Sequence, residues 1–133
     1  MQGVRQQLAV ATRSRILIAE DHVDSREALR YLLEAFGFEV SVAANGRSAI
    51  EVALATPPSL ILMDLMMPGM DGFDAIRELR KDPRTSDVPI IAVTAVDSLQ
   101  EALDAGANDY VRKPVDLRHL IWLVNRWIPH EAT

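Results

Sequence analysis

The sequence predicts an α/β fold, a doubly wound sheet of five parallel strands with helices on both faces. Short runs rich in Val, Ile and Leu alternate along the chain with longer stretches whose apolar residues repeat at helical spacing. The run Ser59–Asp64 is apolar without alternation, which is typical of a strand covered on both faces. Strands that alternate with helices form parallel sheets, because each helix carries the chain back across a face of the sheet.

Five short apolar runs are expected to be the strands. They are Arg15–Ala19, Phe38–Ala43, Ser59–Asp64, Val88–Thr94 and Asp109–Arg112. Pro89 is tolerable only near the start of the fourth strand, because proline has no N–H to donate to a neighbouring strand.

Five helices are expected between and after these strands. They are Asp24–Phe36, the segment from Asn45 through Ala55, the segment from Asp71 to about Lys81, Asp97–Ala105, and a last helix from Asp116 to Pro129. Side chains able to accept hydrogen bonds from free N–H groups are expected to cap four of them: Asp24, Asn45, Asp71 and Asp116. Gly37 and Gly106 are expected to end two helices, since glycine readily adopts the left-handed conformation found there.

Length and composition limit the class of protein. The 133 residues fit one domain, expected over residues 15–129, with a leader at 1–14 and a tail at 130–133. The chain has no cysteine, which excludes a disulfide framework, a cysteine nucleophile and a thiolate zinc site. A net charge of −5 argues against direct binding of nucleic acid. No apolar run approaches the roughly 18 residues of a membrane span, and Met1–Ser14 lacks the apolar segment of a signal peptide, so a cytoplasmic location is expected.

Polar residues interrupt the apolar strands at their carboxyl ends. Glu20 and Asp21 follow the first strand, Asp64 ends the third, Thr94 ends the fourth, and Lys113 follows the fifth. Open parallel sheets bind ligands at this edge, so three carboxylates, one hydroxyl and one ammonium are expected to meet there. Crowded carboxylates repel one another unless a cation intervenes, and their hard oxygen atoms suit Mg²⁺.

The same residues carry a family resemblance. Together with the segment MDLMMPGMDG around Asp64, and the pairs Thr94-Ala95 and Lys113-Pro114, they resemble the receiver domain of two-component response regulators. The resemblance covers about Arg15 to Pro129 and implies the flavodoxin-like strand order 2-1-3-4-5. It implies that a histidine kinase or a histidine phosphotransfer protein passes a phosphoryl group to this chain. It also implies that the chain is not an enzyme beyond its own phosphorylation and dephosphorylation.

The resemblance assigns a role to each residue of the expected site. Asp64 would be the phosphoacceptor, while Thr94 and Lys113 would bind phosphoryl oxygens. Four residues would hold Mg²⁺: Glu20, Asp21, Asp64 and, through its backbone carbonyl, Met66. The peptide bond between Lys113 and Pro114 is expected to be cis, a form that about 5–6% of X–Pro bonds in folded proteins adopt.

Charge explains why a metal would be needed. The three carboxylates contribute −3 and Lys113 contributes +1, so the site carries −2 without a divalent ion. Such a site repels a phosphate donor, whereas Mg²⁺ brings the net charge of the site to zero. Phosphoryl transfer is then promoted mainly by positioning and charge neutralisation. A carboxylate can itself act as the nucleophile and form an aspartyl phosphate.

The resemblance also implies a conformational switch. Thr94 would move toward the phosphoryl group and Tyr110 would follow into the space it leaves. The surface formed by helix 97–105, strand 109–112 and the last helix would then change for a downstream protein or a second copy of the chain. Trp122 lies opposite the apolar stripe of the last helix and is a candidate interface residue. The alternatives are that Trp122 is a lone exposed apolar residue, which is common on protein surfaces, or that it packs against the leader.

Some positions depart from the family pattern. The stretch from Thr94 to Gly106 is shorter than in many members, so the helix there or the loop before it is expected to be shortened. Met66 and Val96 occupy positions that flank the phosphoryl group in the family and affect the approach of water. Both side chains are apolar and cannot orient an attacking water, so slow spontaneous dephosphorylation is expected. The three histidines, His22, His119 and His130, show no metal-ligand spacing, and His22 is expected to be solvated.

Two other functions remain open at this point. A metal-dependent phosphatase would also use an aspartate at a strand end. However, such enzymes carry a general acid two residues later, where this chain has Met66. A phosphorylation-independent interaction module on the same fold typically lacks the acceptor or the lysine, and this chain keeps both Asp64 and Lys113.

Overall fold

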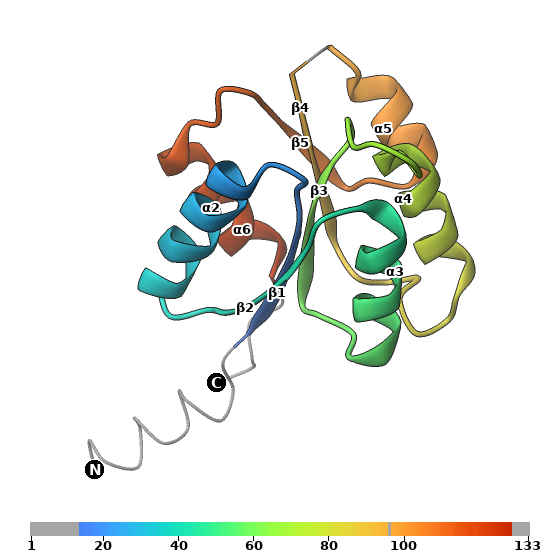
Figure 1. Cartoon of the computed structure of the whole chain (residues 1–133), viewed down its shortest axis with the longest axis horizontal. Coiled ribbons are helices and arrows are strands. Elements are labelled where there is room, and N and C mark those ends of the chain that lie inside the picture. The colour runs from blue at the N-terminus through green and yellow to red at the C-terminus, as the bar shows by residue number, and fades with distance from the viewer. Residues whose placement is uncertain (1–13, 96, 129–133) are drawn as a thin grey trace.

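One parallel sheet forms the centre of the molecule. The computed structural model describes residues 14–95 and 97–128, and within them the strand order is β2-β1-β3-β4-β5. The strands are β1 (Arg15–Ala19), β2 (Glu39–Ala43), β3 (Leu60–Asp64), β4 (Ile90–Thr94) and β5 (Asp109–Arg112). All four neighbouring pairs are parallel, which confirms the expected fold class and places β1 beside β3 (Figure 1).

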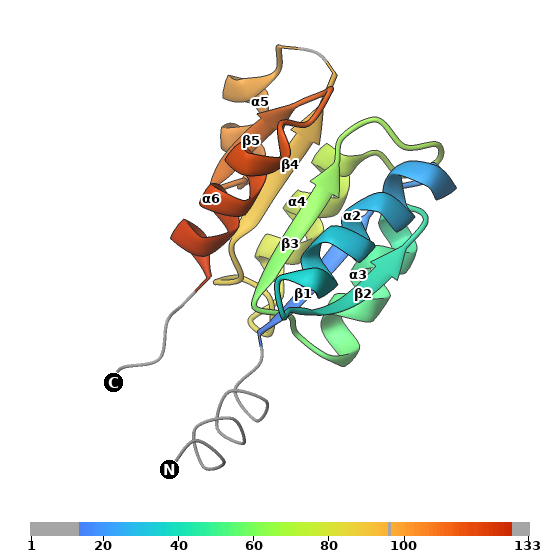
Figure 2. The ribbon, with the colours of Figure 1, turned by 90° about the vertical axis from the view of Figure 1, so that its left-hand side faces the viewer.

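Helices cover both faces of this sheet. They are α2 (Val23–Ala35), α3 (Gly46–Ala55), α4 (Gly72–Lys81), α5 (Leu99–Ala105) and α6 (Leu117–Trp127). The views in Figures 1 and 2 show α2 and α6 on one face and α3, α4 and α5 on the other. No helix within the described ranges is long and apolar enough to cross a membrane. The expected leader (except Ser14), Val96, Pro129 and the tail lie outside the described residues.

The central strands contribute side chains to two separate hydrophobic clusters. Along β3, Ile61 and Met63 pack with α3, α4 and α5, whereas Leu60 and Leu62 pack with α2 and α6. Side chains alternate between the faces of a strand, so a strand covered on both sides is apolar at every position. Every residue of β3 and β4 is buried accordingly, including the terminal Asp64 and Thr94.

Three of the four expected helix caps are confirmed. The side chains of Asn45, Asp71 and Asp116 accept hydrogen bonds from backbone N–H groups in the first turns of α3, α4 and α6. Gly37 and Gly106 follow the ends of α2 and α5 with φ of 95° and 124°, so their expected positions are also confirmed.

The expected cap at Asp24 is wrong. Helix α2 begins at Val23, two residues after Asp21, so Asp24 already lies in the first helical turn. His22 occupies the N-cap position and makes no side-chain cap hydrogen bond. An acidic residue in the first turn still interacts favourably with the helix dipole.

Several elements begin later than the sequence pattern suggests. Strand β4 starts at Ile90 instead of Val88, because Pro89 cannot donate a ladder hydrogen bond. Helix α5 starts at Leu99 instead of Asp97 and is only seven residues long. Strands β2 and β3 each begin one residue later than expected, at Glu39 and Leu60.

Arg80 of α4 joins the loops at the amino ends of β4 and β5. Its guanidinium donates hydrogen bonds to four carbonyls and one amide oxygen. The acceptors are Thr85 O at 3.3 Å, Ser86 O at 3.1 Å, Val88 O at 2.7 Å, Gly106 O at 2.9 Å and Asn108 Oδ1 at 2.8 Å. This arrangement lies at the edge of the sheet opposite the expected site.

Candidate functional site

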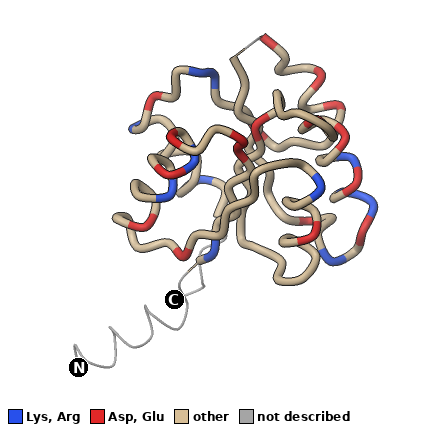
Figure 3. Tube along the Cα trace, viewed as in Figure 1, with Lys and Arg blue, Asp and Glu red and all other residues tan. Residues whose placement is uncertain are grey.

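The carboxyl ends of neighbouring strands place the expected site residues at one edge of the sheet. Ala19, the last residue of β1, pairs in register with Met63 of β3. Glu20 and Asp64 each follow one of these paired residues, so they lie at the same level on adjacent strands. Figure 3 shows acidic residues gathered near the centre of the view, where these strands end.

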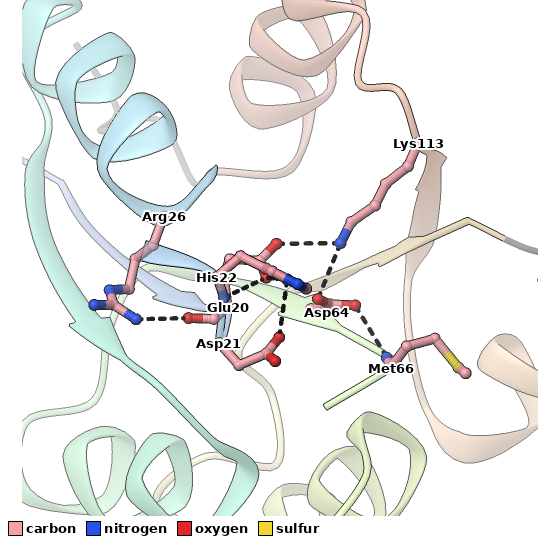
Figure 4. Close-up of polar contacts among 7 residues, drawn as sticks. All are labelled: Glu20, Asp21, His22, Arg26, Asp64, Met66 and Lys113. Carbon is pink, nitrogen blue, oxygen red and sulfur yellow. Dashed lines mark hydrogen bonds and ion pairs between the residues drawn. The ribbon is translucent and has the colours of Figure 1, made fainter. Parts of the chain in front are cut away.

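Lys113 connects two buried carboxylates. Its Nζ lies 3.2 Å from Glu20 Oε1 and 3.0 Å from Asp64 Oδ2 (Figure 4). The other Asp64 oxygen, Oδ1, accepts a hydrogen bond of 3.0 Å from the backbone N–H of Met66. Glu20 and Asp64 are each only 2% exposed. The structure therefore brings together the expected acceptor, one expected metal ligand and the expected lysine.

The protonation preferences of these groups differ. Burial raises the pKa of Asp64, and the negative charge of Glu20 adds to the rise, against the hydrogen bonds from Met66 and Lys113. Burial also opposes ionisation of Glu20, but hydrogen bonds from the His22 N–H, Asp64 and Lys113 outweigh it and lower the pKa of Glu20.

Lys113 is held in its charged form. Burial opposes the ammonium, yet the hydrogen bonds and charges of Asp64 and Glu20 outweigh that effect and raise the pKa of Lys113. Asp64 is thus the carboxylate of this group whose negative charge is least favoured, and it gains most from a further positive charge.

One carboxylate oxygen of Asp21 lacks a hydrogen-bond partner in the described part of the chain. Its Oδ1 is buried and has no hydrogen-bond partner among the described residues. A buried carboxylate oxygen in this condition is costly unless a cation or solvent satisfies it. The set of oxygen donors from Glu20, Asp21 and Asp64 is of the kind that Mg²⁺ prefers. The residues present therefore fit a divalent cation.

Sequence reasoning missed two residues beside this cluster. His22 is 72% exposed in its side chain, as expected of a solvated residue, but its Nδ1 lies 3.3 Å from Glu20 Oε2. Donor atoms of Glu20, Asp21 and His22 all lie within 4.8 Å of one another, a grouping that the spacing of the three histidines did not indicate. Arg26 donates a 3.1 Å hydrogen bond to the backbone carbonyl of Glu20. The position of His22 directly after the acidic pair was the available signal, whereas nothing in the sequence pointed to Arg26.

Thr94 and Lys113 meet through the backbone. The Lys113 N–H donates a 2.7 Å hydrogen bond to the carbonyl of Thr94, and Thr94 is fully buried at the end of β4. The peptide bond from Lys113 to Pro114 is cis. Tyr110 is half-buried, packs beside the cluster under α3, α4 and α5, and pairs in register with Ala92 rather than Thr94.

Two residues singled out in the sequence have exposed side chains: Met66 beside the site and Trp122 away from it. Met66 is 60% exposed although its backbone holds Asp64. Trp122 on α6 is 57% exposed, with its ring stacked on His119 at 6.2 Å and covered by the Arg126 guanidinium at 5.4 Å. Exposure of Trp122 agrees with its expected orientation away from the core.

A glycine brings α4 against the end of β3. A Cβ atom added at Gly72 would lie 2.5 Å from the carbonyl oxygen of Asp64 and 2.6 Å from Cα of Leu65. The Gly72 N–H also donates a 3.2 Å hydrogen bond to the Leu65 carbonyl. Only glycine permits this close approach of helix and strand end.

A cavity of about 280 Å³ lies beside Lys113, between α2 and the segment that follows β5. Its lining combines charged residues of the site with apolar side chains. The lining residues include Glu20, Leu29, Lys113, Pro114 and Leu117. The acidic cluster is therefore next to an apolar surface that a bound protein could contact.

Comparison with known proteins gives a consistent result. Residues 16–125 match the family described as "Response regulator receiver domain". Protein PilH of Pseudomonas aeruginosa is 39% identical over 115 residues, which cover 84% of this chain and 95% of PilH. Other matched response regulators are longer, and the chain spans 23% of one of them.

Two solved structures are similar over most of the chain. The receiver domain of a sensor histidine kinase from Pseudomonas aeruginosa, with a magnesium ion coordinated in the active site cleft, has a TM-score of 0.81. It is 35% identical, with 88% of this chain and 98% of that chain covered. The second is a co-crystal structure of the Saccharomyces cerevisiae phosphotransfer protein Ypd1 and the receiver domain of its downstream response regulator Ssk1. It matches with a TM-score of 0.80 and 30% identity, with 87% of this chain and 89% of that chain covered.

Proposed function

Because the chain belongs to the response regulator receiver domain family, we propose that it accepts a phosphoryl group on Asp64 from a histidine kinase or a histidine phosphotransfer protein. The observation that carries the proposal is the contact of Lys113 Nζ with both Glu20 and Asp64, at 3.2 Å and 3.0 Å. This contact gathers, at the carboxyl edge of the sheet, a buried nucleophile, an acidic partner and a fixed positive charge.

Asp64 supplies the nucleophilic oxygen. In the transfer, a P–O bond forms to the Asp64 carboxylate while the P–N bond to the donor histidine breaks, and the electron pair of that bond leaves with the histidine nitrogen. The Met66 N–H and Lys113 Nζ hold the two carboxylate oxygens in place, one each. Catalysis of phosphoryl transfer depends mainly on such positioning and on charge stabilisation.

Lys113 and Thr94 act on the transferred group. The Lys113 ammonium stabilises negative charge on the phosphoryl oxygens, and the Thr94 hydroxyl donates a hydrogen bond to one of them. Movement of Thr94 toward that oxygen leaves space for Tyr110, and the surface of α5, β5 and α6 changes as a result. That surface is the proposed site for a downstream partner or a second copy of the chain.

Glu20, Asp21, Asp64 and the backbone carbonyl of Met66 would hold Mg²⁺. The buried Asp21 Oδ1 without a hydrogen-bond partner supports this assignment, as does the magnesium ion in the cleft of a similar receiver domain. When bound, the ion neutralises charge on the carboxylates and on the transferring phosphoryl group.

The donor protein would contact the apolar surface beside Lys113. The cavity of about 280 Å³ between α2 and the segment after β5 opens next to the acceptor, and a similar receiver domain was crystallised with a phosphotransfer protein. The chain would catalyse no reaction beyond its own phosphorylation and dephosphorylation.

Intact-mass measurement tests the proposal. The chain is incubated with acetyl phosphate or phosphoramidate and Mg²⁺, and the mass of one phosphoryl group should be gained. Asp64→Ala should abolish the gain, while Asp74→Asn, at an exposed position on α4, should keep it. A wild-type chain that stays unmodified with both donors would overturn the proposal and favour a phosphorylation-independent interaction module.

A further inference from the structure

We propose that the His22 imidazole is an additional ligand of the cation site at Glu20 and Asp21, and that the site therefore binds borderline divalent ions such as Zn²⁺ and Co²⁺. The inference rests on the proposed function, because it uses the same acidic cluster as the cation site. It adds a nitrogen ligand and a class of ion that the carboxylates alone do not favour.

The distances among the three side chains suit one shared ion. His22 Nδ1 lies 3.3 Å from Glu20 Oε2 and 3.5 Å from Asp21 Oδ1 (Figure 4). Ligand atoms that are each about 2.0–2.2 Å from a single zinc ion are separated from one another by about 3.0–3.5 Å. A small rearrangement of side chains is therefore enough for all three atoms to contact one ion.

The oxygen atoms that face His22 have no contact with Lys113. Lys113 engages Oε1 of Glu20 at 3.2 Å. Oε2 accepts a 3.1 Å hydrogen bond from the His22 backbone N–H and lies 3.3 Å from the imidazole Nδ1. Oδ1 of Asp21 is buried without a hydrogen-bond partner among the described residues. The His22 side chain is 72% exposed, so an ion can reach the cluster from solvent.

The chemistry of the ligands determines the preferred ion. Mg²⁺ favours oxygen ligands and retains several waters. Imidazole nitrogen favours Co²⁺, Ni²⁺ and Zn²⁺, whose affinities for mixed nitrogen and oxygen sites exceed those of earlier divalent ions. The neutral imidazole adds a ligand without adding negative charge, so His22 changes the selectivity of the site more than its charge.

Paired titrations of His22→Ala test the inference. Dissociation constants for Zn²⁺ and for Mg²⁺ are measured separately by calorimetry, in a buffer that does not chelate metal, and their ratio is compared. Loss of His22 should reduce the preference for Zn²⁺ over Mg²⁺ by about tenfold or more. The replacement removes no side-chain cap from α2, because His22 makes none.

His119→Ala is the matched control. This exposed histidine lies on α6, where its ring stacks on Trp122 at 6.2 Å, and its loss should leave the ratio at the wild-type value. As a second readout, Co²⁺ should shift the NMR signals of the His22 ring protons strongly in the wild-type chain.

The outcomes separate the two proposals. A chain that binds Mg²⁺ but shows the same ratio with and without His22 would overturn the role of His22 alone. An equal change in His119→Ala, or unshifted His22 ring signals with Co²⁺ bound, would do the same. A wild-type chain that binds neither Mg²⁺ nor Zn²⁺ would overturn the cation site on which the proposed function also depends.

Discussion

At the scale of single residues, the two carboxylate oxygens of Asp64 have different hydrogen-bond partners. Oδ2 contacts the Lys113 ammonium and Oδ1 accepts from the Met66 N–H, at 3.0 Å in both cases. The pKa of the carboxyl is nevertheless raised by burial and by Glu20. Carboxyls with shifted pKa values are more common at functional sites, where charge is concentrated at a cost in stability.

Replacement of Asp64 by asparagine should stabilise the metal-free chain. A carboxyl whose pKa is raised on folding destabilises the folded chain when it is ionised. This destabilisation grows as pH rises above the usual carboxyl pKa of 3.8. At pH 7 without divalent ions, Asp64→Asn should raise the free energy of unfolding by about 1 kcal/mol. Urea denaturation measures it, and the gain should disappear near pH 3. A variant less stable than wild type at pH 7 would contradict the argument.

Met66→Asn should shorten the lifetime of the phosphorylated chain. The Met66 side chain is 60% exposed beside the acceptor and cannot orient an attacking water. An amide can do so, and we expect dephosphorylation to accelerate by roughly tenfold, less than the about 100-fold or more of a full general base. Decay of the phosphorylated mass after removal of the donor measures the rate. Met66→Leu keeps the site apolar and serves as the control, and equal lifetimes for Met66→Asn and Met66→Leu would contradict the idea.

At the scale of secondary-structure elements, local signals were sufficient where one side chain acts on its own helix. Asn45, Asp71 and Asp116 cap their helices as the sequence predicts, because a cap needs only a suitable side chain three residues or fewer from its donor. Asp24 was misplaced because α2 begins one residue earlier than expected, at Val23, with His22 at the N-cap position and no side-chain cap to mark the start.

Contacts between distant segments could not be read from the sequence. Arg80 appears there as one more charged residue of a helix, yet its acceptors belong to the loops before β4 and β5. The candidate site was more accessible to prediction, because parallel strands necessarily bring Glu20, Asp64 and Lys113 to one edge. The involvement of His22 depends on ring orientation, which no sequence pattern specifies.

Arg80→Met should destabilise the fold. The change removes five hydrogen bonds of a partly buried guanidinium and leaves several carbonyls without their donor. We expect a loss of about 2–4 kcal/mol in the free energy of unfolding. Arg77→Met is the control: Arg77 makes an exposed ion pair with Asp74 on the same helix, and its loss should cost less than about 1 kcal/mol. Similar losses for the two variants would contradict a special role for Arg80.

At the scale of the whole molecule, the fold places two buried carboxylates and a buried threonine, Glu20, Asp64 and Thr94, at one edge of a sheet whose centre is almost entirely apolar. Every position of β3 and β4 is buried, and the two strands end in Asp64 and Thr94. The stability of the molecule is therefore linked to whatever ion binds at that edge, because a ligand bound only by the folded state stabilises it.

Magnesium should raise the midpoint of thermal unfolding. At about 100 times the dissociation constant, linkage predicts roughly 2.7 kcal/mol of added stability. Calorimetric scans with increasing Mg²⁺ measure the shift. Asp21→Asn should remove most of it, because the buried Oδ1 of Asp21 is assigned to the cation. A midpoint that rises equally in this variant would show that the ion acts elsewhere.

The absence of a side chain at Gly72 has a mechanical consequence. The first turn of α4 rests directly on the backbone of Asp64 and Leu65, with no flexible group between them to absorb a displacement. At its other end, the same helix carries Arg80, which holds the carbonyl of Gly106 after α5. We therefore expect a shift of the main chain at Asp64 to move the ten residues of α4 together and so to displace Arg80 at the opposite edge of the sheet.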